Sequence, residues 1–96
     1  MMQSGVRNNT AQSRFELDTD GTTAVAYYRL APGTIIFTHT EVDPSLRGRG
    51  IGSALIRGAL EAARAQGLKV VPRCQFVAAY IRRHAEFAEL VASGSD

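Results

Sequence analysis

The sequence has little cysteine and no long hydrophobic run. Its one cysteine cannot form a disulfide within the chain, and this usage favours a reducing compartment. No apolar run approaches the roughly 20 residues that a membrane-spanning helix needs, and residues 1–13 lack the apolar core of a signal peptide. We therefore expect a cytoplasmic protein that does not bind membranes.

Positively and negatively charged side chains nearly balance in this sequence. The sequence contains eleven Lys and Arg and nine Asp and Glu, which gives a formal net charge of +2 and a pI near 9.1. This small excess, with no aromatic residues between the arginines of the glycine-rich stretch, argues against nucleic acid as a partner. Histidines and acids do not recur at metal-ligand spacing, so we expect no metal. A nucleic-acid site would have to use Arg47, Arg49, Arg57, Arg64, Arg82 and Arg83.

The length of 96 residues predicts a single small domain. Residues 1–13 are polar and without periodicity, so we expect a flexible leader there. The domain should span residues 14–92, and residues 93–96 should form a frayed tail.

Three strands are predicted in the first half of the chain. Alternating apolar and polar residues indicate the first, over 14–18, and the second should follow over 24–30; the third, over 34–42, is rich in β-branched and aromatic residues. Two tight turns should join them, at Asp20-Gly21 and at Pro32-Gly33. Three strands joined in this way form an antiparallel meander.

Helical periodicity dominates the second half. Apolar residues recur every three or four positions over about 50–66, and Gly67 should end that helix. A short strand over 68–74 and a second helix over 76–91, broken near His84, should follow. The fold class is therefore α/β (α+β), in the order β-β-β-α-β-α, with a mixed sheet that contains a parallel β-α-β unit.

Ligands of open α/β sheets bind at the carboxyl ends of the strands. The parallel unit spans residues 34–74, so the ends of its two strands should lie side by side. Those ends carry His39, Glu41 and Val42 on the first strand, and Arg73 and Cys74 on the second.

The densest chemical signal is RGRGIGSALI, residues 47–56, where arginines alternate with glycines just before a helix. The start of a helix offers unpaired N–H groups and a partial positive charge, which suit a phosphate. A plain basic turn has the same composition. A P-loop is disfavoured because the stretch has no lysine. A dinucleotide motif is disfavoured because Ser53 replaces its third glycine and residues 68–74 contain no acid.

A third pattern fits this stretch. The spacing Arg47-x-x-Gly50-x-Gly52 resembles the pyrophosphate-binding motif of GNAT-type N-acetyltransferases, Arg/Gln-x-x-Gly-x-Gly/Ala. The phrases HTEV, GRGIGSAL, GLKVVPRC and FVAAYI extend the resemblance, over residues 14–91, to the small acetyltransferases of that superfamily. It implies a minimal GNAT-like fold and an acyltransferase that moves an acetyl group from acetyl-CoA to a small-molecule or protein amine.

The resemblance also implies where acetyl-CoA would bind. Its pyrophosphate would meet the glycine-rich loop, and its pantetheine arm would lie along the end of the preceding strand. The implied binding residues are Val42, Arg47, Gly48, Arg49, Gly50, Ile51, Gly52 and Ser53.

The candidate catalytic residues are His39, Glu41 and Cys74. His39 and Glu41 share one face of an alternating strand, so either could take the proton of the amine. Cys74 could be an inert core residue, a nucleophile that carries the acetyl group, or a contact for pantetheine.

Full-length members of the superfamily carry a helical pair between their first two strands, where this chain has only residues 19–23. A second copy could supply the missing floor of the acceptor site, so self-association is one expectation. A non-catalytic CoA-binding module is the alternative function.

Overall fold

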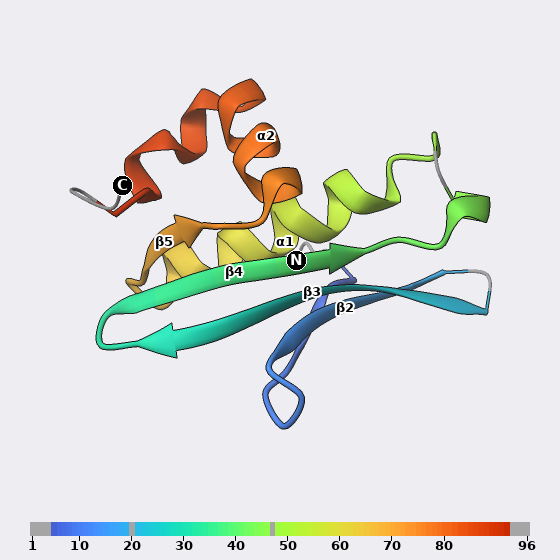
Figure 1. The fold of residues 1–96 in the computed structure, drawn as a ribbon, viewed down its shortest axis with the longest axis horizontal. Coiled ribbons are helices and arrows are strands. Elements are labelled where there is room, and N and C mark those ends of the chain that lie inside the picture. The colour runs from blue at the N-terminus through green and yellow to red at the C-terminus, as the bar shows by residue number, and fades with distance from the viewer. Residues whose placement is uncertain (1–4, 20, 47, 93–96) are drawn as a thin grey trace.

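The computed structural model describes residues 5–19, 21–46 and 48–92. Five strands, two α-helices and two short 3-10 helices make up this part of the chain (Figure 1). In chain order they are β1 (Arg7–Asn9), β2 (Arg14–Thr19), β3 (Thr22–Ala31), β4 (Thr34–Glu41), η1 (Pro44–Leu46), α1 (Ile51–Ala65), β5 (Lys69–Pro72), α2 (Gln75–Arg83) and η2 (Ala85–Leu90).

The strands form one mixed sheet in the order β1-β2-β3-β4-β5. The first four strands pair antiparallel, and β5 pairs parallel to β4. In Figure 1 the helix α1 crosses behind the sheet, and α2 follows β5 and contacts α1. This arrangement confirms the fold class predicted from the sequence.

Helix α1 carries the core. It begins after Gly50, and a Schellman motif ends it, in which Gly67 has φ of 72° and the N–H of Leu68 donates to the carbonyl of Ala63 at 2.9 Å. Its apolar face meets the helix-facing side chains of the strands. The largest fully buried members of this core are Phe15, Ile35, Phe37, Leu55, Ile56, Leu60, Val70, Val77 and Phe87.

The second helix breaks where the sequence predicted. His84 leaves helical geometry, with φ of −128° and ψ of 82°, and η2 continues beyond it. Its ring stacks on Tyr80 at 3.9 Å between centroids, and its Nδ1 lies 2.9 Å from the Tyr80 carbonyl oxygen. His84 therefore closes the end of α2.

The predicted flexible leader is partly wrong. Residues 7–9 of the 1–13 segment form β1, which pairs with β2, and residues 1–4 lie outside the described part. A charge cluster holds this strand. Glu16, only 4% exposed, accepts a hydrogen bond from Asn9 Nδ2 at 2.9 Å and pairs with Arg7 at 2.7 Å and Arg14 at 2.6 Å. The side chains of β1 are polar, and Arg7 and Asn9 pair with Glu16, so the strand lacks the alternation of apolar residues from which a strand could have been predicted.

Because of this cluster, the free energy of unfolding should fall as the pH becomes acidic. Hydrogen bonds from Asn9 and Arg14 hold the pKa of Glu16 below its ordinary value. The stabilisation is therefore complete above the unfolded pKa and is lost as pH falls through the folded one. We expect Glu16→Gln to lower the melting temperature at neutral pH and to flatten its fall towards pH 3, measured by thermal unfolding. The exposed Glu89→Gln is the control, and parallel wild-type and Glu16→Gln curves would contradict this prediction.

A β-bulge in β4 decides which side chains face the helices. Phe37 pairs with Tyr28 and His39 with Tyr27, so Thr38 is the extra residue. Beyond the bulge, Thr40 pairs with Ala26, which belongs to the helix-facing core. His39 therefore lies on the opposite face of the sheet.

Candidate functional site

The loop before α1 is shaped by glycine conformation. Gly48 and Gly50 have φ of 80° and 75°, and no atom of the described residues, the flanking ones apart, lies within 4 Å of where a Cβ would be at either position. Glycine is needed here for its positive φ. The N–H of Ser45 donates to Asp43 Oδ1 at 2.8 Å, which lowers the pKa of that carboxyl and fixes the turn that leads into the loop.

Among the described residues, no side chain caps the first turn of α1. Gly50 occupies the N-cap position, and no acidic residue lies in the first turn. The N–H groups there lack the side-chain oxygens that often satisfy them, and they carry the positive end of the helix dipole. This end of the helix is suited to an anion. Arg47, predicted to contribute, lies outside the described residues.

A cleft of about 580 Å³ opens beside this turn. Six of the predicted binding residues line it, whereas Arg49 is exposed and is not part of its wall. Thr40, Leu46 and Phe76 also line it, and the sequence did not single them out. The full lining is Thr40, Val42, Leu46, Gly48, Gly50, Ile51, Gly52, Ser53 and Phe76.

Phe76 packs directly over the glycine-rich turn. A Cβ at Gly52 would lie 2.5 Å from Cζ of Phe76 and 3.2 Å from its Cε atoms. The residue as a whole is 42% exposed. A side chain at position 52 would therefore require the Phe76 ring, whose tip lies against this backbone, to move.

The sheet opens at the far end of the cleft. The ladder between β4 and β5 ends at Phe37–Pro72, although β4 continues to Glu41. The N–H groups of Arg73 and Cys74 both donate to the Phe37 carbonyl, at 3.1 and 3.0 Å, as the chain turns into α2. Beyond this point β5 no longer pairs with the edge of β4.

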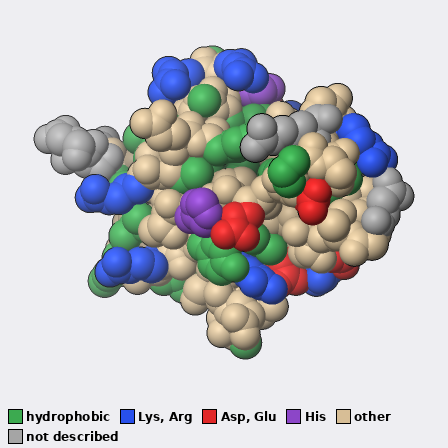
Figure 2. Space-filling view, turned by 45° about the vertical axis from the view of Figure 1, so that its right-hand side comes forward, with side chains coloured by type: hydrophobic (Ala, Val, Ile, Leu, Met, Phe, Trp, Pro, Cys, Tyr) green, Lys and Arg blue, Asp and Glu red, His purple; other side chains and the backbone are tan. Residues whose placement is uncertain are grey.

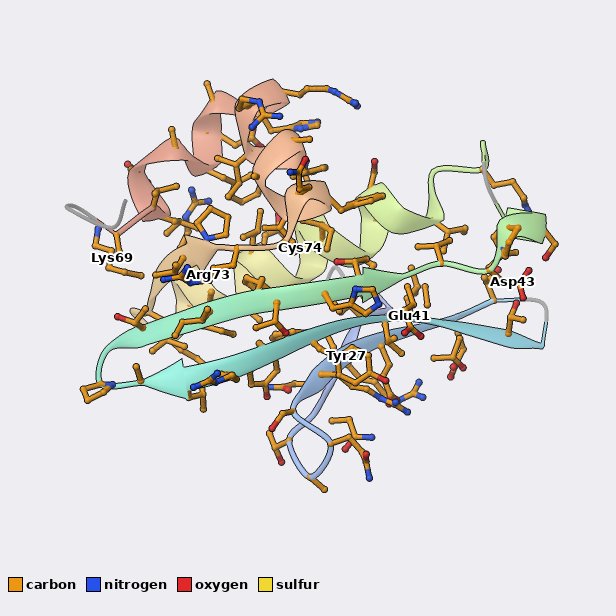
Figure 3. The ribbon with its side chains drawn as sticks, viewed as in Figure 1. Tyr27, Glu41, Asp43, Lys69, Arg73 and Cys74 are labelled. Carbon is orange, nitrogen blue, oxygen red and sulfur yellow. The ribbon has the colours of Figure 1, made fainter. Side chains whose placement is uncertain are left out.

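Cys74 lies at this opening as the N-cap residue of α2 (Figure 3). Its thiol is a free thiol, and the residue is 8% exposed. Sγ lies 3.3 Å from Oγ1 of Thr40, which itself lines the cleft. Cys74 thus sits behind the cleft wall, one side chain away from the cleft.

His39 and Glu41 point to the other face of the sheet. His39 Nε2 lies 3.1 Å from Glu41 Oε2, and each side chain is 60% exposed. The His39 ring stacks on Tyr27, whose hydroxyl accepts a hydrogen bond from Arg14 at 3.0 Å. Figure 2 shows a histidine touching an acidic side chain on an open surface. The sequence correctly predicted that the two residues share a face, but that face does not line the cleft.

The described residues contain neither a metal cluster nor a membrane-spanning helix. No three of their histidine, cysteine, aspartate or glutamate side chains gather closely enough to hold a metal ion. Among their helices, none has the length and apolar character needed to cross a membrane.

Residues 14–90 match the family model described as GCN5-related N-acetyl-transferase. An NMR solution structure of a GCN5-like protein from Staphylococcus aureus, proposed there to be an N-acetyltransferase, is similar with a TM-score of 0.71 at 23% sequence identity. The alignment covers 96% of this chain and 91% of that chain, and it shows the shared fold. No curated protein matches the sequence significantly. The family model covers most of the chain, which therefore belongs to the GCN5-related N-acetyltransferase family of acyltransferases.

Proposed function

We propose that the protein uses acetyl-CoA as its acetyl donor and transfers the acetyl group to an amine. The observation that carries this proposal is a single cleft joining the uncapped first turn of α1 to Thr40 at the end of β4. The first-turn N–H groups suit a pyrophosphate. Val42 and Leu46 give the cleft an apolar wall for the pantetheine arm, and the unpaired edge of β4 offers backbone partners to its amides.

The reaction needs an amine without its proton. As the N–C bond forms, the C–S bond of the thioester breaks, its electron pair stays on sulfur, and a base accepts the proton of the amine. We propose His39 as that base and Glu41 as the group that orients its ring. Successive side chains of a strand point to opposite faces of the sheet. A thioester beside Thr40 would therefore be separated from His39 by the backbone of β4. For the amine to reach both groups, it would have to enter through the gap that β5 leaves beside β4 beyond Phe37–Pro72.

Calorimetric titration and a turnover assay test this function directly. Acetyl-CoA should bind to the purified protein, and free CoA should be released when amines are supplied as acceptors. Binding without turnover over a broad amine panel would identify a CoA-binding module instead. Absence of binding would overturn the proposal.

Cys74 has a secondary role in this scheme, because its thiol is buried and already in contact with Thr40. We expect Cys74→Ala to keep turnover within about tenfold of wild type, the loss of one ordinary hydrogen bond. Intact-protein mass spectrometry after incubation with acetyl-CoA alone should find no added acetyl group. An acetyl group mapped to residue 74, together with a Cys74→Ala protein that has lost turnover, would establish a covalent route.

A further inference from the structure

A second hollow lies beyond the cleft, between the first turn of α1 and the length of α2. It measures about 80 Å³ and is lined by Ser53, Phe76, Ala79, Tyr80 and Arg83. Small-molecule pockets usually exceed roughly 300 Å³, so this hollow has room for a small group rather than for a nucleoside. It shares Ser53 and Phe76 with the main cleft. The two spaces are therefore neighbours across the Phe76 ring.

Positive charge gathers at the far end of this hollow. Arg83 is exposed, and its guanidinium makes no ion pair or hydrogen bond with residues 5–19, 21–46 or 48–92. Arg57 lies near Tyr80, which helps to raise the pKa of its guanidinium, but it pairs with Glu61 at 3.4 Å and with Glu86 at 3.5 Å. Arg83 thus provides the hollow with a positive charge that an anionic ligand could pair with.

The chemistry of CoA supplies an anion of the right size in the right direction. With a pyrophosphate at the first turn of α1, pantetheine runs towards Thr40 and the ribose leaves from the other end of the pyrophosphate. The hollow that adjoins the cleft at Ser53 and Phe76 offers the ribose a path. That ribose carries the 3′-phosphate. A phosphate and a guanidinium form strong, charge-assisted hydrogen bonds.

We propose that Arg83 binds the 3′-phosphate of CoA in this hollow, so that the protein distinguishes CoA from dephospho-CoA. This inference rests on the proposed use of acetyl-CoA. Phe76 acts as the wall between the phosphate of the ribose and the pyrophosphate, and its partly exposed ring gives the sugar an apolar surface.

Calorimetric titration with CoA and with dephospho-CoA tests the assignment in three proteins: wild type, Arg83→Gln and Arg82→Gln. Arg82 is an exposed neighbour on the same helix and does not line the hollow. Arg82→Gln removes the same charge as Arg83→Gln, and it therefore controls for the change in net charge. We expect Arg83→Gln to weaken CoA binding about fivefold, as for a solvent-exposed ion pair, and to leave dephospho-CoA binding unchanged. Arg82→Gln should bind both ligands as the wild type does.

Three results would overturn the assignment. Equal wild-type affinity for CoA and dephospho-CoA would show that no residue reads the 3′-phosphate. Equal weakening by the two arginine variants would show a general effect of charge rather than a contact at Arg83. A wild-type protein that binds neither ligand would remove the proposed donor along with this site, whereas the first two results leave the donor intact.

Discussion

Gly52→Val is expected to weaken acetyl-CoA binding by at least about a hundredfold, the loss of two hydrogen bonds to charged phosphate. The new Cβ would lie 2.5 Å from Cζ of Phe76, so the ring has to move. Phe76 walls the cleft on one side and the hollow on the other, so a ring displaced towards either one occupies space that the ligand needs. The valine methyls also cover the first-turn N–H groups.

Titration calorimetry measures this loss, and thermal unfolding shows whether the variant remains folded. Ala54→Val is the matched control, since it adds the same β-branched side chain in the same turn at an exposed position outside the cleft. The double variant Gly52→Val/Phe76→Leu separates the two causes. It should recover affinity if the displaced ring blocks the cleft, and should not if the methyls cover the amides. A folded Gly52→Val protein with wild-type affinity would contradict the proposed phosphate site.

The place of the glycine-rich loop was predictable because its signal is local. Gly50 and Gly52 stand at fixed spacing before a periodic helix, and both line the cleft as the sequence indicated. Phe76 was not predictable, because its contact with Gly52 joins two helices that are distant in sequence. Its place in an apolar helical pattern suggests the core, but it lies in the first turn of α2, where the ring reaches the surface.

The faces of β4 show a second limit. Strict alternation from Ile35 and Phe37 would put His39 and Glu41 on the helix-facing side and Thr40 on the other. The bulge at Thr38 reverses this order, and no residue type in the strand marks it. Pattern reasoning can thus group His39 with Glu41 while leaving open which face of the sheet they occupy.

His39→Gln is expected to lower kcat about a thousandfold, within the range that a positioned general base contributes. Glutamine keeps a polar side chain on the open face but cannot take a proton from the amine. The dissociation constant of acetyl-CoA should stay at its wild-type value, because His39 does not line the cleft. Glu41→Gln should cost about tenfold, because it removes the carboxylate 3.1 Å from the imidazole and leaves the imidazole itself in place.

Turnover measured against pH tests the role more sharply than a single rate. If His39 is the base, the pH profiles of the wild type and of His39→Gln should differ, because only the rise that comes from the free amine remains in the variant. Arg29→Gln is the control, since Arg29 is an exposed β3 residue on the same open face, outside the cleft and paired with Ile36 rather than with His39. If His39→Gln keeps wild-type turnover, the amine loses its proton to another group. If His39→Gln instead weakens acetyl-CoA binding as much as it lowers turnover, His39 belongs to the donor site. That result would contradict an acceptor that approaches His39 from the open face.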